Sequence, residues 1–246
     1  MSRSIVATIT RRELAAYFQS PVAYVFLVIF LLLAGVFTFT FGGFFERGEA
    51  SLASFFNWVP WLFLFLVPAV GMRLWSEERR LGTIELLLTM PVASWQAILG
   101  KFLASWLFLA IALALTFPMI VTVNWLGDPD NGVIASGYVG ALLLAGAYLA
   151  ISSMTSAMTR NQVIAFIVAV VLCLLLILVG FTPVTDMLAR WASPPVVESV
   201  ARFSVLTHYD GFQKGVIDTR DLAYFLSVVA FSLFATGVII RGHRAG

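Results

Sequence analysis

The amino-acid sequence predicts an all-α polytopic membrane protein with six transmembrane helices. Of its 246 residues, 61% are hydrophobic and only 11% are charged, whereas soluble domains usually carry about 25% charged residues. Several apolar runs reach about 20 residues, which is the length that a helix needs to cross about 30 Å of hydrocarbon. These runs are continuously apolar, so they indicate helices surrounded by lipid or by one another.

The expected spans follow from the apolar runs and the polar residues between them. They lie at about 22–41, 55–72, 98–124, 136–157, 162–182 and 222–240. The fourth is rich in small residues, and its Gly146-x-x-x-Ala150 spacing lets a neighbouring helix approach closely. Packing within one chain and a contact between two chains both fit that pattern. We expect residues 1–246 to form a single transmembrane domain.

The segment before the first span, residues 1–20, is expected to be an interfacial helix. It mixes the apolar residues Ile5 and Ile9 with Arg11 and Arg12. A helix lying in the membrane interface buries such an apolar face while its arginines meet anionic headgroups. An ordinary charged flank is the alternative.

The longest outer loop, residues 183–221, is expected to contain short helices between spans five and six. Prolines separate two apolar clusters in it, a pattern typical of short amphipathic or re-entrant helices. Asp218 and Asp221 provide an N-cap and an acidic first turn, which predicts that the last span starts there.

The distribution of positive charge predicts the orientation. With the N-terminus inside, ten of the fifteen Lys and Arg residues fall in inner segments, and four of the other five share the long outer loop. Cytoplasmic loops carry the excess of positive charge. Both termini are therefore expected in the cytoplasm, together with the loop between spans two and three.

That cytoplasmic loop, residues 73–97, is the most informative segment of the chain. Gly82 interrupts the local pattern, Thr83 is suited to cap the next turn through its hydroxyl, and Glu85 falls in that turn. Residues 84–90 then predict a short apolar helix, which a proline ends. Exposing apolar surface costs about 25 cal/mol per Å². We therefore expect the helix to pack on the bundle, on the membrane interface or on a partner protein.

Two motifs carry a resemblance to a known family. The first is the run Glu77-Glu78-Arg79-Arg80-x-Gly82-Thr83-x-Glu85-Leu86-Leu87-x-Thr89-x-Pro91-Val92, followed by Gly100-Lys101 at the start of the next span. With the arrangement of six spans, it resembles the ABC-transporter permeases of the type-2 exporter class over essentially the whole chain. The second is His208-Tyr209-Asp210-x-Phe212-x-x-Gly215-Val216-Ile217-Asp218, leading into Tyr224-Phe225. It is similar to the gliding-motility-associated subset of these permeases.

The resemblance implies the permease subunit of an ATP-driven transporter in a bacterial cytoplasmic (inner) membrane. In such families the loop between spans two and three is a coupling loop, seated in a cleft of a separate ATP-binding cassette subunit that binds ATP and Mg²⁺. Carried over to this chain, the contact residues would be Glu77, Glu78, Arg79, Arg80, Gly82, Thr83, Glu85, Leu86, Leu87, Leu88 and Pro91.

The resemblance also implies two permeases and two ATPases per complex, either as a homodimer or with a related permease. Spans one and five would line the seam between the permeases, where the candidate residues are Phe30, Phe37, Phe41, Phe166 and Leu175. An auxiliary outer-face subunit would meet the 183–221 loop. The other expected contact is the lipid bilayer, and no nucleic acid is expected.

The chain itself is expected to hold no catalytic residue, metal or cofactor. Gly100-Lys101 is followed by Phe102 and lacks the upstream glycine of the phosphate-binding loop G-x-x-x-x-G-K-[ST]. No His, Cys or carboxylate cluster has the spacing of metal ligands. ATPase activity is therefore expected in a partner subunit.

Three other functions are alternatives to a transporter subunit driven by ATP. A carrier driven by an ion gradient commonly places ionisable residues deep in the membrane, and the middles of the expected spans contain none. A hydrolase needs a nucleophile and a base at matched depth, but His208 and His243 lie on opposite sides of the membrane. A related complex that performs mechanical or signalling work without transport has the same sequence pattern as an exporter.

Overall fold

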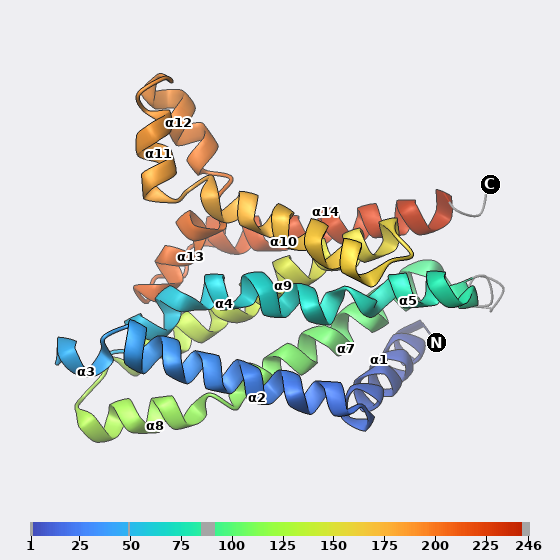
Figure 1. Ribbon diagram of the computed structural model, residues 1–246, viewed down its shortest axis with the longest axis horizontal. Helices are drawn as coiled ribbons and strands as arrows, with labels where there is room; N and C mark the ends of the chain where they lie inside the picture. The colour runs from blue at the N-terminus through green and yellow to red at the C-terminus, as the bar shows by residue number, and fades with distance from the viewer. Residues whose placement is uncertain (1, 49, 85–91, 243–246) are drawn as a thin grey trace.

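The computed structural model describes residues 2–48, 50–84 and 92–242, and over these ranges the chain is helical with no strand (Figure 1). The all-α prediction is therefore confirmed. In chain order the elements are α1 (Ser2–Gln19), α2 (Pro21–Val36), the π-helical turn η1 (Phe37–Phe41), α3 (Phe44–Arg47), α4 (Ala53–Gly71), α5 (Arg73–Leu81), α7 (Ser94–Ala114), α8 (Phe117–Leu126), α9 (Asn131–Met158), α10 (Gln162–Leu178), α11 (Thr182–Leu188), α12 (Pro194–Ala201), α13 (Val205–Gln213) and α14 (Thr219–Gly242).

Helix α9 lies at the centre of the bundle, in contact with α4, α5, α7, α10, α13 and α14. Its small residues leave room for neighbouring helices to pack closely against it. A Cβ atom on Gly140 would come within 2.5 Å of Phe212, and one on Gly146 within 3.1 Å of the Trp106 indole nitrogen. Ala150 is fully buried. The Gly146-x-x-x-Ala150 pattern thus serves packing within the chain, the first of the two expected uses.

Five helical units are long and apolar enough to cross a membrane, and a bent pair brings the number to six. The five are Pro21–Glu46, Ala53–Leu81, Ser94–Leu126, Asn131–Met158 and Thr219–Gly242, and the pair is Gln162–Leu178 with Thr182–Leu188. A multi-pass helical membrane protein is therefore confirmed, with its exact number of crossings resting on the bent pair.

The fifth expected span, 162–182, is shorter than the sequence indicates. Helix α10 ends at Leu178, and the chain turns by 68° into α11. A Cβ on Gly180 would lie 2.3 Å from the Ser204 Cβ, so the chain at the turn is pressed against the start of α13. A proline in the first turn of α11 then begins a new helix.

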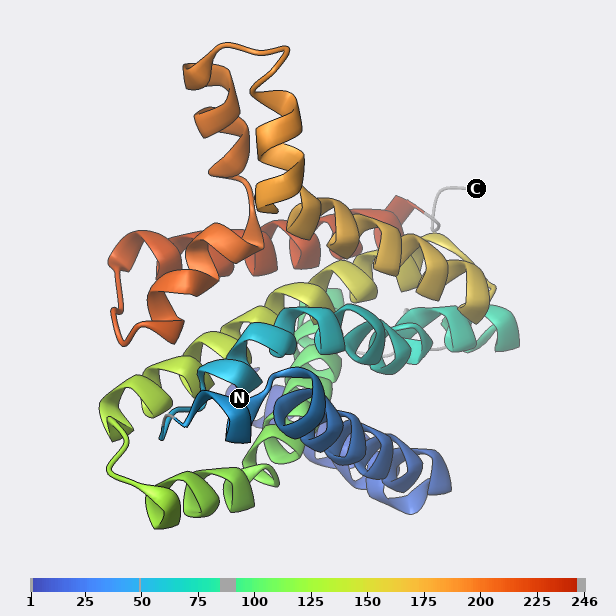
Figure 2. The same cartoon turned by 60° about the vertical axis from the view of Figure 1, so that its left-hand side comes forward.

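The two ends of the bundle carry different elements. Figure 1 shows both termini and α5 at one end, and α3 and α13 at the other. Figure 2 shows α11 and α12 projecting from the bundle as a pair. The short helices expected between spans five and six are α11, α12 and α13. The predicted start of the last span is confirmed, because Asp218 accepts a hydrogen bond from the Arg220 amide at 2.9 Å.

Candidate functional site

The segment expected to be a loop after span two begins as a helix. Helix α5 continues α4, and the two together form one unit of 29 residues, Ala53–Leu81. We call α5 the arm. It is amphipathic, with Leu74, Trp75 and Ser76 buried and Arg80 and Leu81 exposed. The helix therefore extends nine residues past the expected end of span two, at 72.

A serine of α9 holds the base of the arm. The Ser156 hydroxyl accepts hydrogen bonds from the backbone amides of Trp75 and Ser76, both at 3.0 Å, and donates one to the Met72 carbonyl at 2.8 Å. The first amides of a helix lack partners within the helix. Ser156 satisfies two of them and so fixes the junction of α4 and α5 to α9.

Two longer side chains of the arm also bind the end of α9. The Trp75 indole N–H donates to the Ser153 hydroxyl at 3.0 Å. The Arg79 guanidinium donates to the Ala157 carbonyl at 2.5 Å. Carbonyls in the last turn of a helix are unpaired, and a cation there also interacts favourably with the helix dipole. Arg79 is therefore an intramolecular anchor.

Lys101 links the arm to two further helices. Its ammonium lies 2.8 Å from a Glu78 carboxylate oxygen and 3.5 Å from one of Glu13, and it sits 5.6 Å from the centre of the Trp75 ring. The Lys101 side chain is only 10% exposed. A buried charge is tolerated when it is paired and hydrogen-bonded. The Glu13–Lys101–Glu78 cluster thus joins α1, α7 and the arm.

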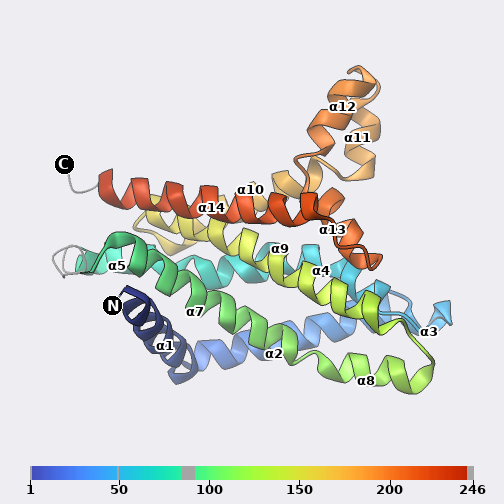
Figure 3. The same cartoon turned by 180° about the vertical axis from the view of Figure 1, so that it is seen from behind.

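Helix α1 is attached along the first half of α7 (Figure 3). The Thr10 hydroxyl donates to the Gly100 carbonyl at 3.2 Å, and the Tyr17 hydroxyl lies 2.8 Å from that of Ser105. The Tyr17 ring stacks on Phe108 at 5.0 Å between centroids. Burial raises the pKa of Tyr17 to about 12, so the phenol stays neutral and hydrogen-bonded. Movement of α1 and movement of α7 are thereby coupled.

The arm ends at Gly82, whose φ of 72° is in the left-handed region that favours glycine. Thr83 follows with its hydroxyl directed back to the Glu78 carbonyl at 3.4 Å. It therefore contacts the end of the arm, and its expected role as a cap concerns the turn that begins at 84 and continues into residues 85–91, which lie outside the described residues. Arg80, Leu81, Gly82 and Thr83 are exposed at the tip.

The residues expected to contact a partner divide into two groups. Glu77, Arg80, Gly82 and Thr83 are partly or fully exposed, whereas Glu78 and Arg79 are engaged within the chain. The remaining residues of that set lie outside the described ranges: Glu85, Leu86, Leu87, Leu88 and Pro91.

The residues expected at a seam between permeases are also unequal in exposure. Phe30 is 1% exposed and packs on Phe63, so it offers no surface to a second chain. Phe37 is half-buried against Trp58, and Phe166 is half-buried on α10. Phe41 and Leu175 are exposed. Their role at a seam stays a prediction.

Sequence reasoning missed Glu13, Trp75, Ser153 and Ser156 as parts of this site. One available signal was Lys101, which lies inside the expected span 98–124 and is the only charge in it. A cation in such a run requires a partner. The partners were not readable, because Glu13 is 88 residues away in the chain.

The second motif forms a separate cluster at the opposite end of the bundle. The His208 imidazole lies 2.7 Å from an Asp221 oxygen and 2.8 Å from the Arg202 carbonyl, and its ring stacks on Tyr224 at 4.0 Å. The Tyr224 hydroxyl donates to the Phe203 carbonyl at 2.7 Å. These contacts fasten α13 to α14, and they give His208 a structural role.

The helical bundle and its candidate spans define a multi-pass helical membrane protein. A family model described as "ABC-2 family transporter protein" matches residues 52–209, from the start of α4 to within α13. The match covers more than half of the chain and includes the arm. The chain therefore belongs to the ABC-2 family of transporter proteins, and the resemblance to type-2 ABC permeases is confirmed. No curated protein matches the sequence.

Proposed function

We propose that this permease is the transmembrane subunit of an ATP-driven exporter in a bacterial inner membrane. A separate ATP-binding cassette subunit binds ATP and Mg²⁺ and supplies the hydrolysis. The chain crosses the membrane six times, α10 and α11 forming the bent fifth crossing, with both termini and the arm in the cytoplasm and α1 in the interface. We place it in the gliding-motility-associated subset because its second motif resembles that of those permeases.

The observation that carries this proposal is the attachment of the arm. The arm and the second span belong to one helical unit, and Ser156, Arg79 and Lys101 bind the arm to α9 and α7. A force applied at its tip therefore reaches the spans directly, because a helix with such side contacts moves as a unit. A flexible loop would absorb the same displacement.

The docking surface comprises the exposed tip and the segment that follows it. Arg80 and Thr83 are the accessible polar groups of the tip, and Leu81 is 64% exposed. Exposed apolar surface beside charges is typical of a protein interaction site. The family resemblance adds Glu85, Leu86, Leu87, Leu88 and Pro91 to the proposed contact, although these lie outside the described residues.

A second permease would pack along α2 and α10. Exposed apolar residues occur on both helices, including Val25, Leu32, Ile164 and Val171. The pathway would lie in the seam between the two permeases. The projecting α11–α12 pair, whose Trp191 is 87% exposed, would receive an auxiliary subunit on the outer face.

Site-directed cross-linking tests this assignment on the complex co-expressed with an ATPase encoded beside it. The single native cysteine, Cys173, is buried, so Thr83→Cys and the matched outer control Ser199→Cys each introduce one accessible thiol. We expect Thr83→Cys to cross-link to the ATPase and to react with impermeant maleimide only from the cytoplasmic side. Ser199→Cys should react only from outside and form no cross-link.

The proposal is refuted if the co-expressed ATPase fails to purify with the wild-type chain in mild detergent, or if Thr83→Cys reacts from the outer side. If ATP hydrolysis drives a mechanical output and no substrate is exported, the coupling to the ATPase stands. The proposed work is then mechanical and not export.

A further inference from the structure

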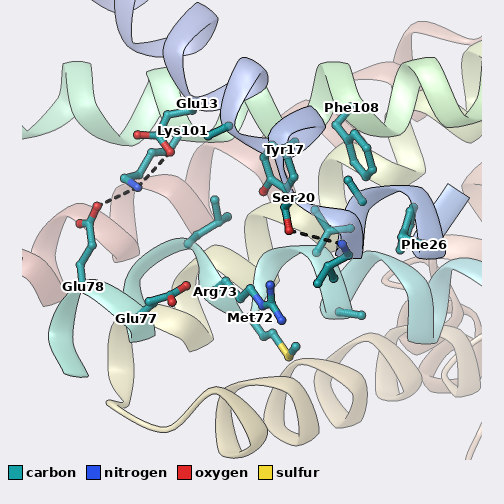
Figure 4. Close-up of a pocket in the computed structure, with 16 residues that line it drawn as sticks. Glu13, Tyr17, Ser20, Phe26, Met72, Arg73, Glu77, Glu78, Lys101 and Phe108 are labelled. Atoms are coloured by element: carbon teal, nitrogen blue, oxygen red, sulfur yellow. Dashed lines mark hydrogen bonds and ion pairs between the residues drawn. The ribbon is translucent and has the colours of Figure 1, made fainter. Parts of the chain in front are cut away.

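A cavity of about 440 Å³ lies beside the arm, between α1, α2, α4 and α7. Figure 4 shows that its two ends differ in chemistry: Glu13, Glu78 and Lys101 lie at one end, and Phe26 and Phe108 at the other. Ligand pockets in proteins commonly have volumes of about 300–1,000 Å³. The division between a charged end and an apolar end fits an amphiphilic molecule.

The charges that line this cavity are not all satisfied within the chain. Lys101 is neutralised by Glu78 and Glu13. Arg73 is exposed at the cavity and forms no ion pair with any residue in the described ranges. It lies, in the view of Figure 4, between Glu77 and the apolar end. An unpaired guanidinium at this position is a binding group for phosphate.

Two carboxylates beside Arg73 also have free acceptor oxygens. The second oxygen of Glu78 is buried and receives no hydrogen bond from the part of the chain that the structure describes. Glu77 has only a loose, largely exposed contact with Arg80, at 3.9 Å. A buried acceptor without a donor costs about 1–3 kcal/mol. An ammonium group at this end would pair with Glu77, whose side chain is accessible from the cavity.

We propose that the cavity binds a glycerophospholipid whose headgroup carries a primary ammonium, taken from the cytoplasmic leaflet. The Arg73 guanidinium binds the phosphate, Glu77 binds the ammonium, and Phe26 and Phe108 line the start of an acyl chain. The position at the leaflet boundary rests on the topology proposed above, since the cavity lies where α2 and α4 reach the end of the bundle that carries both termini.

Charge balance selects this headgroup over an anionic one. The cavity is lined by the carboxylates Glu13, Glu77 and Glu78 against the cations Arg73 and Lys101, which gives a formal net charge of 2 − 3 = −1. A lipid with a phosphate and no ammonium adds a second negative charge to this site and leaves Glu77 with only its loose contact to Arg80. A polar group that is left unpaired lowers the affinity for the lipid that lacks an ammonium group.

Native mass spectrometry of the full-length chain, released from mild detergent without any ATPase, tests the proposal. The probes are phosphatidylethanolamine and phosphatidylglycerol with identical acyl chains, each added alone. We expect retention of one phosphatidylethanolamine with an affinity at least about tenfold higher than that for phosphatidylglycerol, equivalent to about 1.4 kcal/mol.

Three variants locate the site. Arg73→Gln should lose about tenfold in phosphatidylethanolamine affinity. The matched control Arg160→Gln, an exposed arginine outside the cavity lining, should retain the wild-type value. Glu77→Gln should reduce the preference for phosphatidylethanolamine over phosphatidylglycerol. Its control is Glu198→Gln on α12, which should leave that preference unchanged. Ala16→Phe fills the cavity from an exposed position and should abolish retention while every charge stays in place.

Equal retention of the two lipids overturns the proposal, as does an Arg73→Gln variant that behaves like Arg160→Gln or an Ala16→Phe variant that binds as the wild type does. Because no ATPase is present, failure of this binding leaves the docking of the arm untouched. Failure to capture an ATPase, in turn, leaves the lipid measurement intact.

Discussion

Replacing Lys101 tests whether the cluster that joins α1, α7 and the arm contributes to stability. The Lys101–Glu78 separation of 2.8 Å corresponds to an attraction of about 6 kcal/mol at an effective dielectric constant of about 20. Desolvation offsets most of it. We expect Lys101→Met to destabilise the fold by about 2–3 kcal/mol, because it leaves the largely buried carboxylate of Glu78 without its cation.

A double-mutant cycle with Glu78→Gln separates the pair from other effects of each substitution. Unfolding of the purified chain by SDS in mixed micelles, followed by tryptophan fluorescence, supplies the four free energies of unfolding. We expect a coupling energy of about 1–3 kcal/mol. The matched control is the exposed Arg80–Glu77 pair at 3.9 Å, for which the expected coupling is about 0–1 kcal/mol. A Lys101–Glu78 coupling no larger than that of the control pair would refute the reasoning.

Three further substitutions probe the base and the tip of the arm. Ser156→Ala removes the acceptor of two buried backbone amides and should lower the free energy of unfolding by about 1–3 kcal/mol; an unchanged unfolding midpoint in SDS would contradict this. Gly71→Ala should destabilise by about 1–3 kcal/mol, because its Cβ would lie 2.3 Å from the Cβ of Ser152, whereas Gly35→Ala meets nothing within 4 Å and should be neutral. Gly82→Ala should lower the free energy of unfolding by about 1–2 kcal/mol, since the φ of Gly82 is 72°. The variant should still insert into the membrane but should uncouple ATP hydrolysis from export in vesicles. Normal coupling would show that the turn tolerates a side chain.

The fold was largely predictable because hydrophobicity alone determines where a helix can cross lipid. The last span was placed correctly at both ends, with Asp218 at its start. The second and fifth spans were not, since polarity marks where a segment leaves the hydrocarbon and not where its helix ends. Arg73 to Leu81 are polar and still helical, because α9 supplies Ser153 and Ser156 as partners from about 80 residues away.

The candidate site was predictable as a segment but not residue by residue. Glu77, Glu78, Arg79 and Arg80 are four consecutive charges, and neighbouring positions on a helix point about 100° apart. The sequence does not show how the helix is rotated about its axis, so it does not reveal that Glu78 faces α7 while Arg79 faces α9. That rotation is determined by Trp75 and Lys101, which are buried, and by the distant carbonyl of Ala157.

The short length of α10 makes the protein sensitive to bilayer thickness. Its 17 residues measure about 26 Å, several ångströms less than a typical hydrocarbon layer of about 30 Å. Where α10 and α11 cross as one bent unit, the 68° turn between them decides how much apolar length lies along the membrane normal. Thicker bilayers favour a straighter chain at this turn, and thinner ones favour a sharper bend. We therefore expect acyl-chain length in the host membrane to act on the α11–α12 pair, away from the arm.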